Sequence, residues 1–141
     1  MGISIILSKY NPVLNRLVLL IFTLLFMVAA YGQSDQAEFL EAKRLLSEGK
    51  YSSAKASFGA LSQSEAFGKY AQFYYAISAY KQGDTKQATD AWKQLISQTP
   101  DWPQRSEVLY WLAYSGFESG EYDQGLNYAS QYAKSIDDED A

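Results

Sequence analysis

The chain has 141 residues, which fits a single domain, and 48% of them are hydrophobic, enough to form a core. It contains no cysteine and no histidine. Disulfides, thiolate or imidazole metal sites, cysteine nucleophiles and Ser-His dyads are therefore excluded, and with them most familiar enzyme designs.

The first 32 residues have the layout of a secretory signal peptide. Two basic residues precede an uncharged, largely apolar run at positions 17–30, and Ala30 and Gly32 are small residues at −3 and −1 before Gln33. The run is shorter than the roughly 20 residues that a membrane span needs. We therefore predict cleavage before Gln33 and export to a bacterial periplasm. An uncleaved inner-membrane anchor formed by residues 17–31 is the alternative.

Removal of this segment would leave an acidic protein. The chain has 12 basic and 16 acidic residues, and Lys9 and Arg16 lie within the first 32, so 10 basic and 16 acidic residues remain, a net charge of −6. Phosphate backbones require a basic face, so nucleic acid is not expected as a partner.

Apolar residues at helical spacing predict six helices in the rest of the chain. The expected ranges are 35–48, 51–62, 67–82, 85–99, 103–119 and 121–135. Ser34, Asp84 and Asp101 are the expected N-caps, and Gln87 would complete a capping box with Asp84. A glycine follows the first, third and fifth helices, where the left-handed C′ conformation ends a helix without a side-chain penalty.

The helices repeat as three hairpins. Gly49 and Gly83 lie 34 residues apart, and Gly120 lies 37 residues beyond Gly83. Each glycine stands between two small residues twelve positions apart, which are Ala42 and Ala54, Ala76 and Ala88, and Ala113 and Gly125. Small side chains at these positions would let antiparallel helices cross closely. We predict an all-α solenoid with repeats at 35–66, 67–102 and 103–136, followed by an acidic tail at 137–141.

The central hairpin resembles a tetratricopeptide repeat. Ala88 and Trp92 form the A-x3-aromatic pattern of its second helix, and Pro100 closes the unit. The resemblance covers residues 35–135. The segment 108–125 also looks like repeats of bacterial envelope proteins, namely the periplasmic coordinators of the Tol-Pal system and the repeat lipoprotein of the outer-membrane barrel assembly machine. The chain departs from that lipoprotein because it has no cysteine.

The resemblance implies a concave groove formed by the first helix of each repeat, and a protein or peptide partner bound there. Lysine and large aromatic side chains occupy most of the positions predicted to line it. They are Phe39, Lys43, Tyr70, Phe73, Tyr80, Lys81, Tyr110, Tyr114 and Phe117. The alternative is that several of these rings belong to the core between repeats, as is expected for Tyr74, Tyr75 and Trp111.

These features favour a non-catalytic interaction module without a cofactor or metal. Glu118 and Glu121 are the only carboxylate pair near aromatic residues, and they flank a helix end, where charge is usually solvated. The acidic stretch 137–140 lacks the glycine turn of a calcium loop. The alternative function is an N-terminal spacer or dimerisation domain of a longer envelope protein, associating through its last helix, where Tyr128 and Tyr132 would be partly bare.

Overall fold

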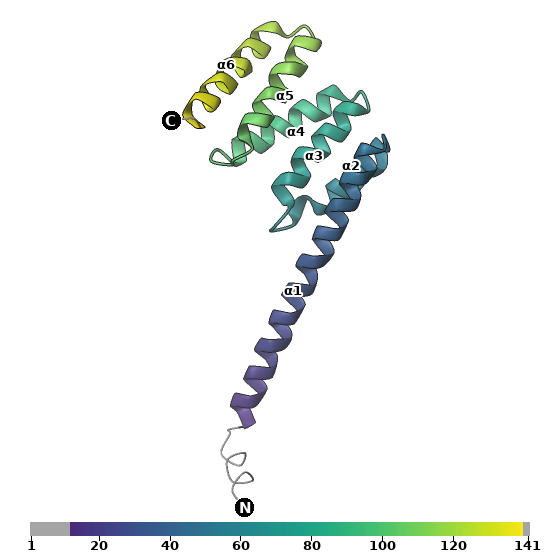
Figure 1. Ribbon diagram of the computed structural model, residues 1–141, viewed down its shortest axis with the longest axis vertical. Coiled ribbons are helices and arrows are strands. Elements are labelled where there is room, and N and C mark those ends of the chain that lie inside the picture. The colour runs from purple at the N-terminus through teal and green to yellow at the C-terminus, as the bar shows by residue number, and fades with distance from the viewer. Residues whose placement is uncertain (1–11, 140–141) are drawn as a thin grey trace, which may run out of the picture.

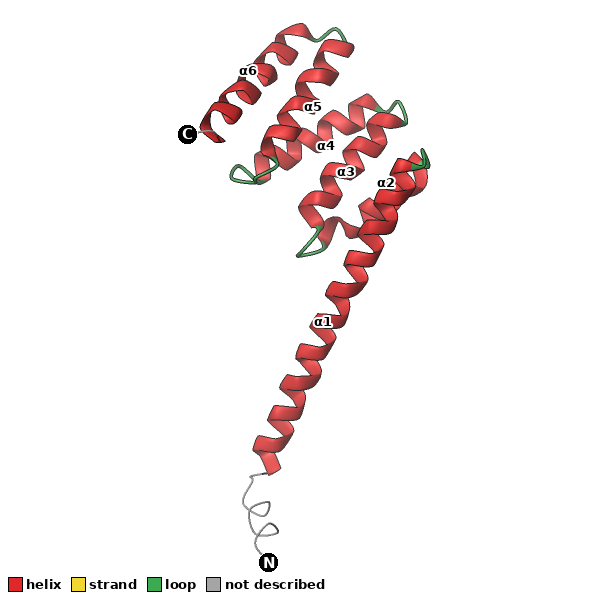
Figure 2. Ribbon diagram, in the orientation of Figure 1, coloured by secondary structure: helices red, strands yellow, loops and turns green. Residues whose placement is uncertain are grey.

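The computed structural model describes the backbone of residues 12–139 and the side chains of residues 16–23 and 34–136. Within this range the chain is helical and contains no strand (Figure 1, Figure 2). The elements are α1 (Pro12–Ser47), α2 (Tyr51–Ala60), a 3-10 turn η2 (Leu61–Gln63), α3 (Gly68–Lys81), α4 (Thr85–Gln98), α5 (Arg105–Glu118) and α6 (Tyr122–Glu139). They form three hairpins stacked in chain order, so the predicted all-α solenoid is confirmed.

A left-handed glycine ends the first helix of every hairpin. Gly49, Gly83 and Gly120 have φ values of 76°, 88° and 79°. After α3, the Gly83 N–H donates to Tyr80 O at 2.9 Å and the Asp84 N–H donates to Ala79 O at 3.0 Å, which is a complete Schellman motif.

The turn before α4 confirms half of the expected capping box. The Asp84 carboxylate accepts a hydrogen bond from the Gln87 N–H at 3.2 Å. The second hydrogen bond of the box, from the Asp84 N–H to the Gln87 side chain, is not formed. The Asp84 N–H donates to Ala79 O, and Gln87 Oε1 accepts from Lys55 Nζ at 3.0 Å.

Small residues let the paired helices approach closely, as predicted. Ala42, Ala54, Ala76 and Ala88 have no exposed surface. The approach is closest in the third hairpin, where a Cβ placed on Gly116 of α5 would lie 2.9 Å from the Gly125 Cα of α6. Gly116 was not singled out from the sequence, because the repeat register pointed to Ala113 as the small residue of this helix.

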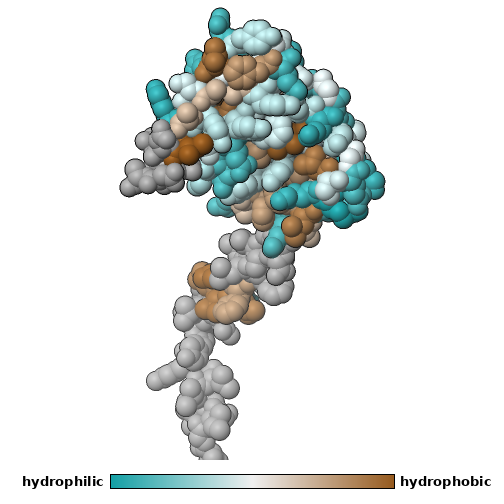
Figure 3. All heavy atoms as spheres, turned by 45° about the horizontal axis from the view of Figure 1, so that its top comes forward, coloured by the Kyte–Doolittle hydropathy of each residue, from teal (hydrophilic) through white to brown (hydrophobic). Residues whose placement is uncertain are grey.

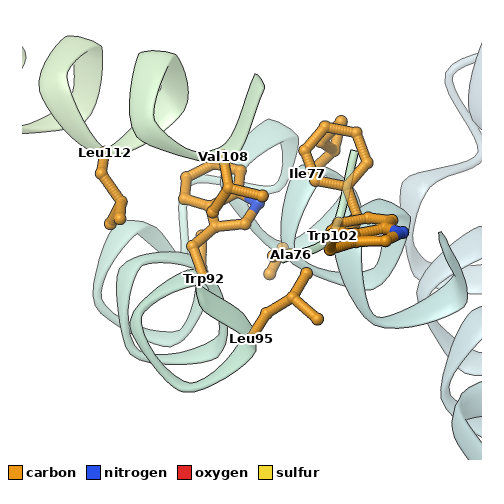
Figure 4. Packing of buried hydrophobic residues seen from close by; sticks show 10 residues of the cluster. Ala76, Ile77, Trp92, Leu95, Trp102, Val108 and Leu112 are labelled. Atoms are coloured by element: carbon orange, nitrogen blue, oxygen red, sulfur yellow. The ribbon is translucent and has the colours of Figure 1, made fainter. Parts of the chain in front are cut away.

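The core joins the second and third hairpins through Trp92 and Trp102 (Figure 4). Trp102 lies in the connection between α4 and α5, is only 7% exposed, and meets the Tyr70 ring edge-on at 5.3 Å. The predicted Asp101 cap and the helix start near Pro103 are therefore wrong. The buried indole holds this connection in a turn, and α5 begins at Arg105 after Gln104, which makes no side-chain cap.

The start of the first helix also differs from the prediction. Ser34 does not cap a helix, because α1 runs without interruption from Pro12 to Ser47, and the Ser34 hydroxyl donates to Glu38 within that helix at 3.4 Å. A single glycine at position 32 costs only about 1 kcal/mol in a helix and does not break it. Figure 1 shows this part of α1 projecting beyond the hairpins.

The projecting part of α1 carries exposed apolar side chains from Leu17 to Phe22, visible as a brown band in Figure 3. Within the described residues, no helix is both long enough and apolar enough to span a membrane. Residues 1–11 of the predicted signal peptide lie outside the described residues. At the other end, α6 runs to Glu139, so it takes in the first part of the acidic stretch 137–141, of which 140–141 lie outside the description.

Candidate partner-binding face

Side chains of the first helices meet from one hairpin to the next. Lys43 of α1 lies over the Tyr74 ring of α3, with its Nζ 5.1 Å from the ring centroid. Lys81 of α3 lies over the Trp111 ring of α5 at 6.0 Å. Both ammonium groups are near the faces of aromatic rings, where the ring quadrupole attracts a cation. These contacts define a continuous surface across α1, α3 and α5.

Four rings gather at the α3–α5 end of this surface, and we call Tyr80, Tyr110, Trp111 and Tyr114 the aromatic face. Tyr80 lies 5.6 Å from Trp111 at 60° and 6.2 Å from Tyr114 at 70°. Tyr110 and Tyr114 are nearly parallel, with an interplanar angle of 18° and centroids 6.2 Å apart. These geometries are typical of stabilising ring pairs, so each ring restricts its neighbours.

The aromatic face packs against the core on one side and is exposed to solvent on the other. Trp111 stacks on the fully buried Trp92 at 5.6 Å and 20°, which anchors the cluster to the core. Tyr110 and Tyr114 are 46% and 41% exposed. Two large rings in fixed positions are thus presented to solvent.

A carboxylate lies at one edge of the aromatic face. Glu118, in the last turn of α5, accepts a hydrogen bond from the Tyr114 hydroxyl at 2.9 Å through Oε1, and one from the Tyr80 hydroxyl through Oε2. The two donors come from different hairpins, so Glu118 links the second and third repeats. From the sequence, Glu118 stands out only as one of two carboxylates at a helix end, because its two tyrosine partners depend on the packing of α3 against α5.

A hollow of about 390 Å³ adjoins the other end of the aromatic face. It is lined by Ser106, Glu107, Tyr110, Trp111, Tyr132 and Ile136. Tyr132 and Ile136 belong to α6, which the sequence prediction left out of the groove. The Tyr110 and Tyr132 rings lie 5.9 Å apart, so the last helix forms one wall. A second hollow, of about 600 Å³, lies between α2, α3 and α4 and is lined largely by glutamine and serine.

The predicted groove residues separate into exposed and buried sets. Phe39 and Phe73 are 9% and 3% exposed and belong to the core, so the prediction that they line a groove is wrong. Phe39 is enclosed by the rings of Phe58, Phe67, Tyr70 and Tyr74.

Two further predicted rings lie away from the aromatic face. Tyr70 is half-buried against Trp102. Phe117 is 41% exposed, but its ring lies against α6, where a Cβ placed on Gly125 would be only 3.2 Å from it. Trp111, expected in the core, is half-buried and serves both the core and the aromatic face.

The clear pKa shifts belong to ion pairs on other surfaces. A hydrogen bond from Arg44 lowers the pKa of Glu41, and a hydrogen bond from Lys50 lowers that of Glu48. A hydrogen bond to Asp90 raises the pKa of Lys86. Among the described residues, no group of three or more acidic side chains could hold a metal ion. The aromatic face therefore offers rings, hydroxyls and single charges, which suit recognition of another polypeptide.

Comparison with known families agrees with this architecture. A profile of the tetratricopeptide repeat matches residues 39–101 and 76–141. The two matches together cover most of the chain, and the chain belongs to the tetratricopeptide repeat family. Repeats of this family form protein–protein interaction modules, typically non-catalytic scaffolds. Neither the curated proteins nor the solved structures give a significant match.

Proposed function

We propose that this chain is an adaptor of the bacterial cell envelope that holds a segment of a partner protein across the aromatic face. The observation that carries this proposal is the exposure of Tyr110 and Tyr114 while both remain fixed in a cluster anchored on Trp92. Tyrosine offers large contact area at a small entropic cost, and its hydroxyl adds a polar contact. Rings already ordered in the free protein lose little further freedom on binding.

Charges along the surface support a peptide laid across the first helices. Lys43 and Lys81 project from α1 and α3, and Glu107 and Glu118 from α5, all with exposed side chains. A partner segment would therefore place its acidic residues toward α1 and its basic residues toward α5. Such complementarity sets the orientation and the association rate more than the affinity.

The proposal includes export, with cleavage before Gln33. The side chains of residues 16–23 are all exposed. Contact with the hairpins is made further along α1, where the Asp35 carboxylate accepts a hydrogen bond from the Ser64 hydroxyl at 2.5 Å and Phe39 is buried. Cleavage before Gln33 would leave both contacts in place. The repeat pattern resembling Tol-Pal coordinators and barrel-assembly proteins also favours the periplasm.

Two measurements on the protein expressed in a bacterium test the location. The intact mass of a carboxyl-terminally tagged chain should correspond to an amino terminus at Gln33, and the protein should be released with the periplasmic fraction. A full-length mass in the inner-membrane fraction would instead show that residues 17–31 anchor the chain.

Site-specific photo-crosslinking tests the adaptor proposal. A photoreactive phenylalanine at Tyr110 reports on the aromatic face, and the same residue at Tyr122 is a matched control, because Tyr122 is 64% exposed at the start of α6 and is not part of the aromatic face. We expect a discrete adduct with a partner protein from position 110 only. The same adduct from both positions, or from position 122 alone, would contradict binding at the aromatic face.

Self-association through α6 is a second candidate function, favoured by a separate observation. Apolar side chains recur along α6 at Tyr122, Leu126, Ala129, Ala133 and Ile136, a spacing of four and three that places them on one face. Tyr122, Leu126 and Ile136 are 64%, 60% and 37% exposed, and hydrophobic atoms follow α6 at the upper left of Figure 3. A helix from a second copy could cover this stripe.

The mass of the particle in solution distinguishes this second candidate. Light scattering of the purified protein would give twice the chain mass for a dimer through α6, and Leu126→Glu would convert it to a monomer. A monomeric parent protein would exclude this candidate and leave the adaptor proposal untouched, because that proposal requires no second copy of the chain.

A further inference from the structure

We propose that Glu118, together with the ring of Tyr114, forms a subsite for an arginine side chain of the bound partner segment. This inference rests on the proposed function, because it names the residue type that the aromatic face would select. It begins with the carboxylate of Glu118, which is exposed at the end of α5 and adjoins the open face of the cluster.

The Glu118 carboxylate is oriented but not neutralised. Its two oxygens accept from the hydroxyls of Tyr80 and Tyr114, which fixes the plane of the group. The four ion pairs in the described part of the chain all involve other residues, so Glu118 has no basic side chain within 4.0 Å there. Lys81, the neighbouring cation, lies over Trp111.

The hydrogen-bonding capacity of the carboxylate is only half used. An ionised carboxylate has about four lone-pair sites, and the two tyrosine hydroxyls occupy two of them. One site on each oxygen remains, which is the pattern that a planar guanidinium fills with two parallel N–H donors. A carboxylate fixed in advance binds such a fork without losing rotamer freedom on association.

The adjacent rings favour arginine over lysine. A guanidinium can stack its flat face on an aromatic ring while its edge donates to a carboxylate, and it is less strongly hydrated than an ammonium. Tyr114 is exposed and donates a hydrogen bond to Glu118, so its ring offers that stacking surface, and Tyr110 lies nearly parallel beside Tyr114.

The probe is Nα-acetyl-L-argininamide, whose only charge is the guanidinium, and its neutral control is the citrulline analogue. Binding to the full chain is followed by tryptophan emission, to which Trp111 at the aromatic face contributes, and by the ring-proton shifts of Tyr114. We expect saturable binding with a millimolar Kd, as one bidentate ion pair with stacking gives in water. The citrulline analogue and the corresponding lysinamide should bind at least about fivefold more weakly, because neither offers a charged fork.

Two variants complete the test. Glu118→Gln removes the charge with the same shape, and Glu65→Gln is the matched control because Glu65 is an exposed carboxylate in the turn before α3, at the end of that helix opposite Tyr80. We expect Glu118→Gln to weaken argininamide binding at least about tenfold and Glu65→Gln to leave it unchanged. If Glu118→Gln proves unfolded by circular dichroism, the comparison of the arginine, citrulline and lysine probes on the parent protein still decides.

The outcomes separate this inference from the function on which it rests. Equal binding of the argininamide and citrulline probes, equal loss in both carboxylate variants, or no saturable binding would overturn the arginine subsite. A lower melting temperature of Glu118→Gln with unchanged probe binding would show a purely structural role and would also overturn it. None of these results would remove a partner crosslink at position 110, which tests the adaptor proposal separately.

Discussion

Two glycine-to-alanine substitutions should change stability in opposite directions. Both Gly116 in α5 and Gly59 in α2 lie inside helices, where alanine is favoured over glycine by up to about 1 kcal/mol. At Gly59 a new Cβ would lie 3.6 Å from the Tyr75 ring, which is an ordinary van der Waals contact, so the stabilisation from the higher helix propensity of alanine is retained. At Gly116 the Cβ would lie 2.9 Å from both the N and the Cα of Gly125.

The contact at Gly116 is with backbone, so no side chain can move to relieve it and α5 must separate from α6. Overpacking of this kind costs about 1–3 kcal/mol, which exceeds the gain in helix propensity. We therefore expect Gly116→Ala to lower the free energy of unfolding by about 1–2 kcal/mol and Gly59→Ala to raise it by about 0.5 kcal/mol. Urea denaturation of the two variants and the parent, followed by circular dichroism, measures both. A Gly116→Ala protein as stable as Gly59→Ala would refute the close α5–α6 crossing.

Further predictions follow from the packing and the surface charges. Ala88→Leu should lower the free energy of unfolding by roughly 1–3 kcal/mol through overpacking of α3 against α4. Gly83→Val should lower it by about 1–2 kcal/mol, because φ at this position is 88°. Trp102→Ala should lower the free energy of unfolding by about 3–5 kcal/mol, because it leaves a cavity in the core. An unchanged urea midpoint in any of these three variants would contradict the packing described. The pKa of Asp90 is lowered by its hydrogen bond from Lys86, so the small stabilisation from this pair should be present above the ordinary pKa of 3.8 and be lost as pH falls below it. The stability difference between the parent and Asp90→Asn should accordingly disappear in acid, and a difference that grows there would contradict the ion pair.

Local chemistry was sufficient to predict how the helices pair into hairpins. Glycine is the residue that takes a positive φ without cost, so Gly49 and Gly83 indicate from the sequence alone where helices end. Ala54 and Ala88 marked the crossings because a larger side chain would hold the helices apart. Both signals lie within a single hairpin, and the same physics operates in every copy.

Which side chains form the binding surface depends on contacts between hairpins, and the helical spacing of apolar residues gives no information about those contacts. Phe73 and Tyr110 both lay on the helix face predicted to line the groove, yet Phe73 is buried and Tyr110 is 46% exposed. The difference arises largely from Trp102, which inserts from the connection between α4 and α5 and covers Phe73 and Tyr70 at ring distances of 6.2 and 5.3 Å. An insertion in a connecting segment gives no signal of where its indole will lie. The role of Glu118 was hidden for the same reason, since one of its hydroxyl partners is on α3.

The affinity for the partner identified by crosslinking, measured by calorimetry, tests the central claim most directly. The double variant Tyr110→Ala, Tyr114→Ala removes the exposed rings of the aromatic face, and Tyr122→Ala, Leu126→Ala removes two exposed apolar side chains of α6 as a control. We predict that the first variant weakens binding at least about tenfold, as expected for aromatic residues at the centre of an interface, and that the second changes it less than about twofold. Unchanged affinity in the first variant, with loss in the second, would contradict recognition at the aromatic face and move the interface to α6.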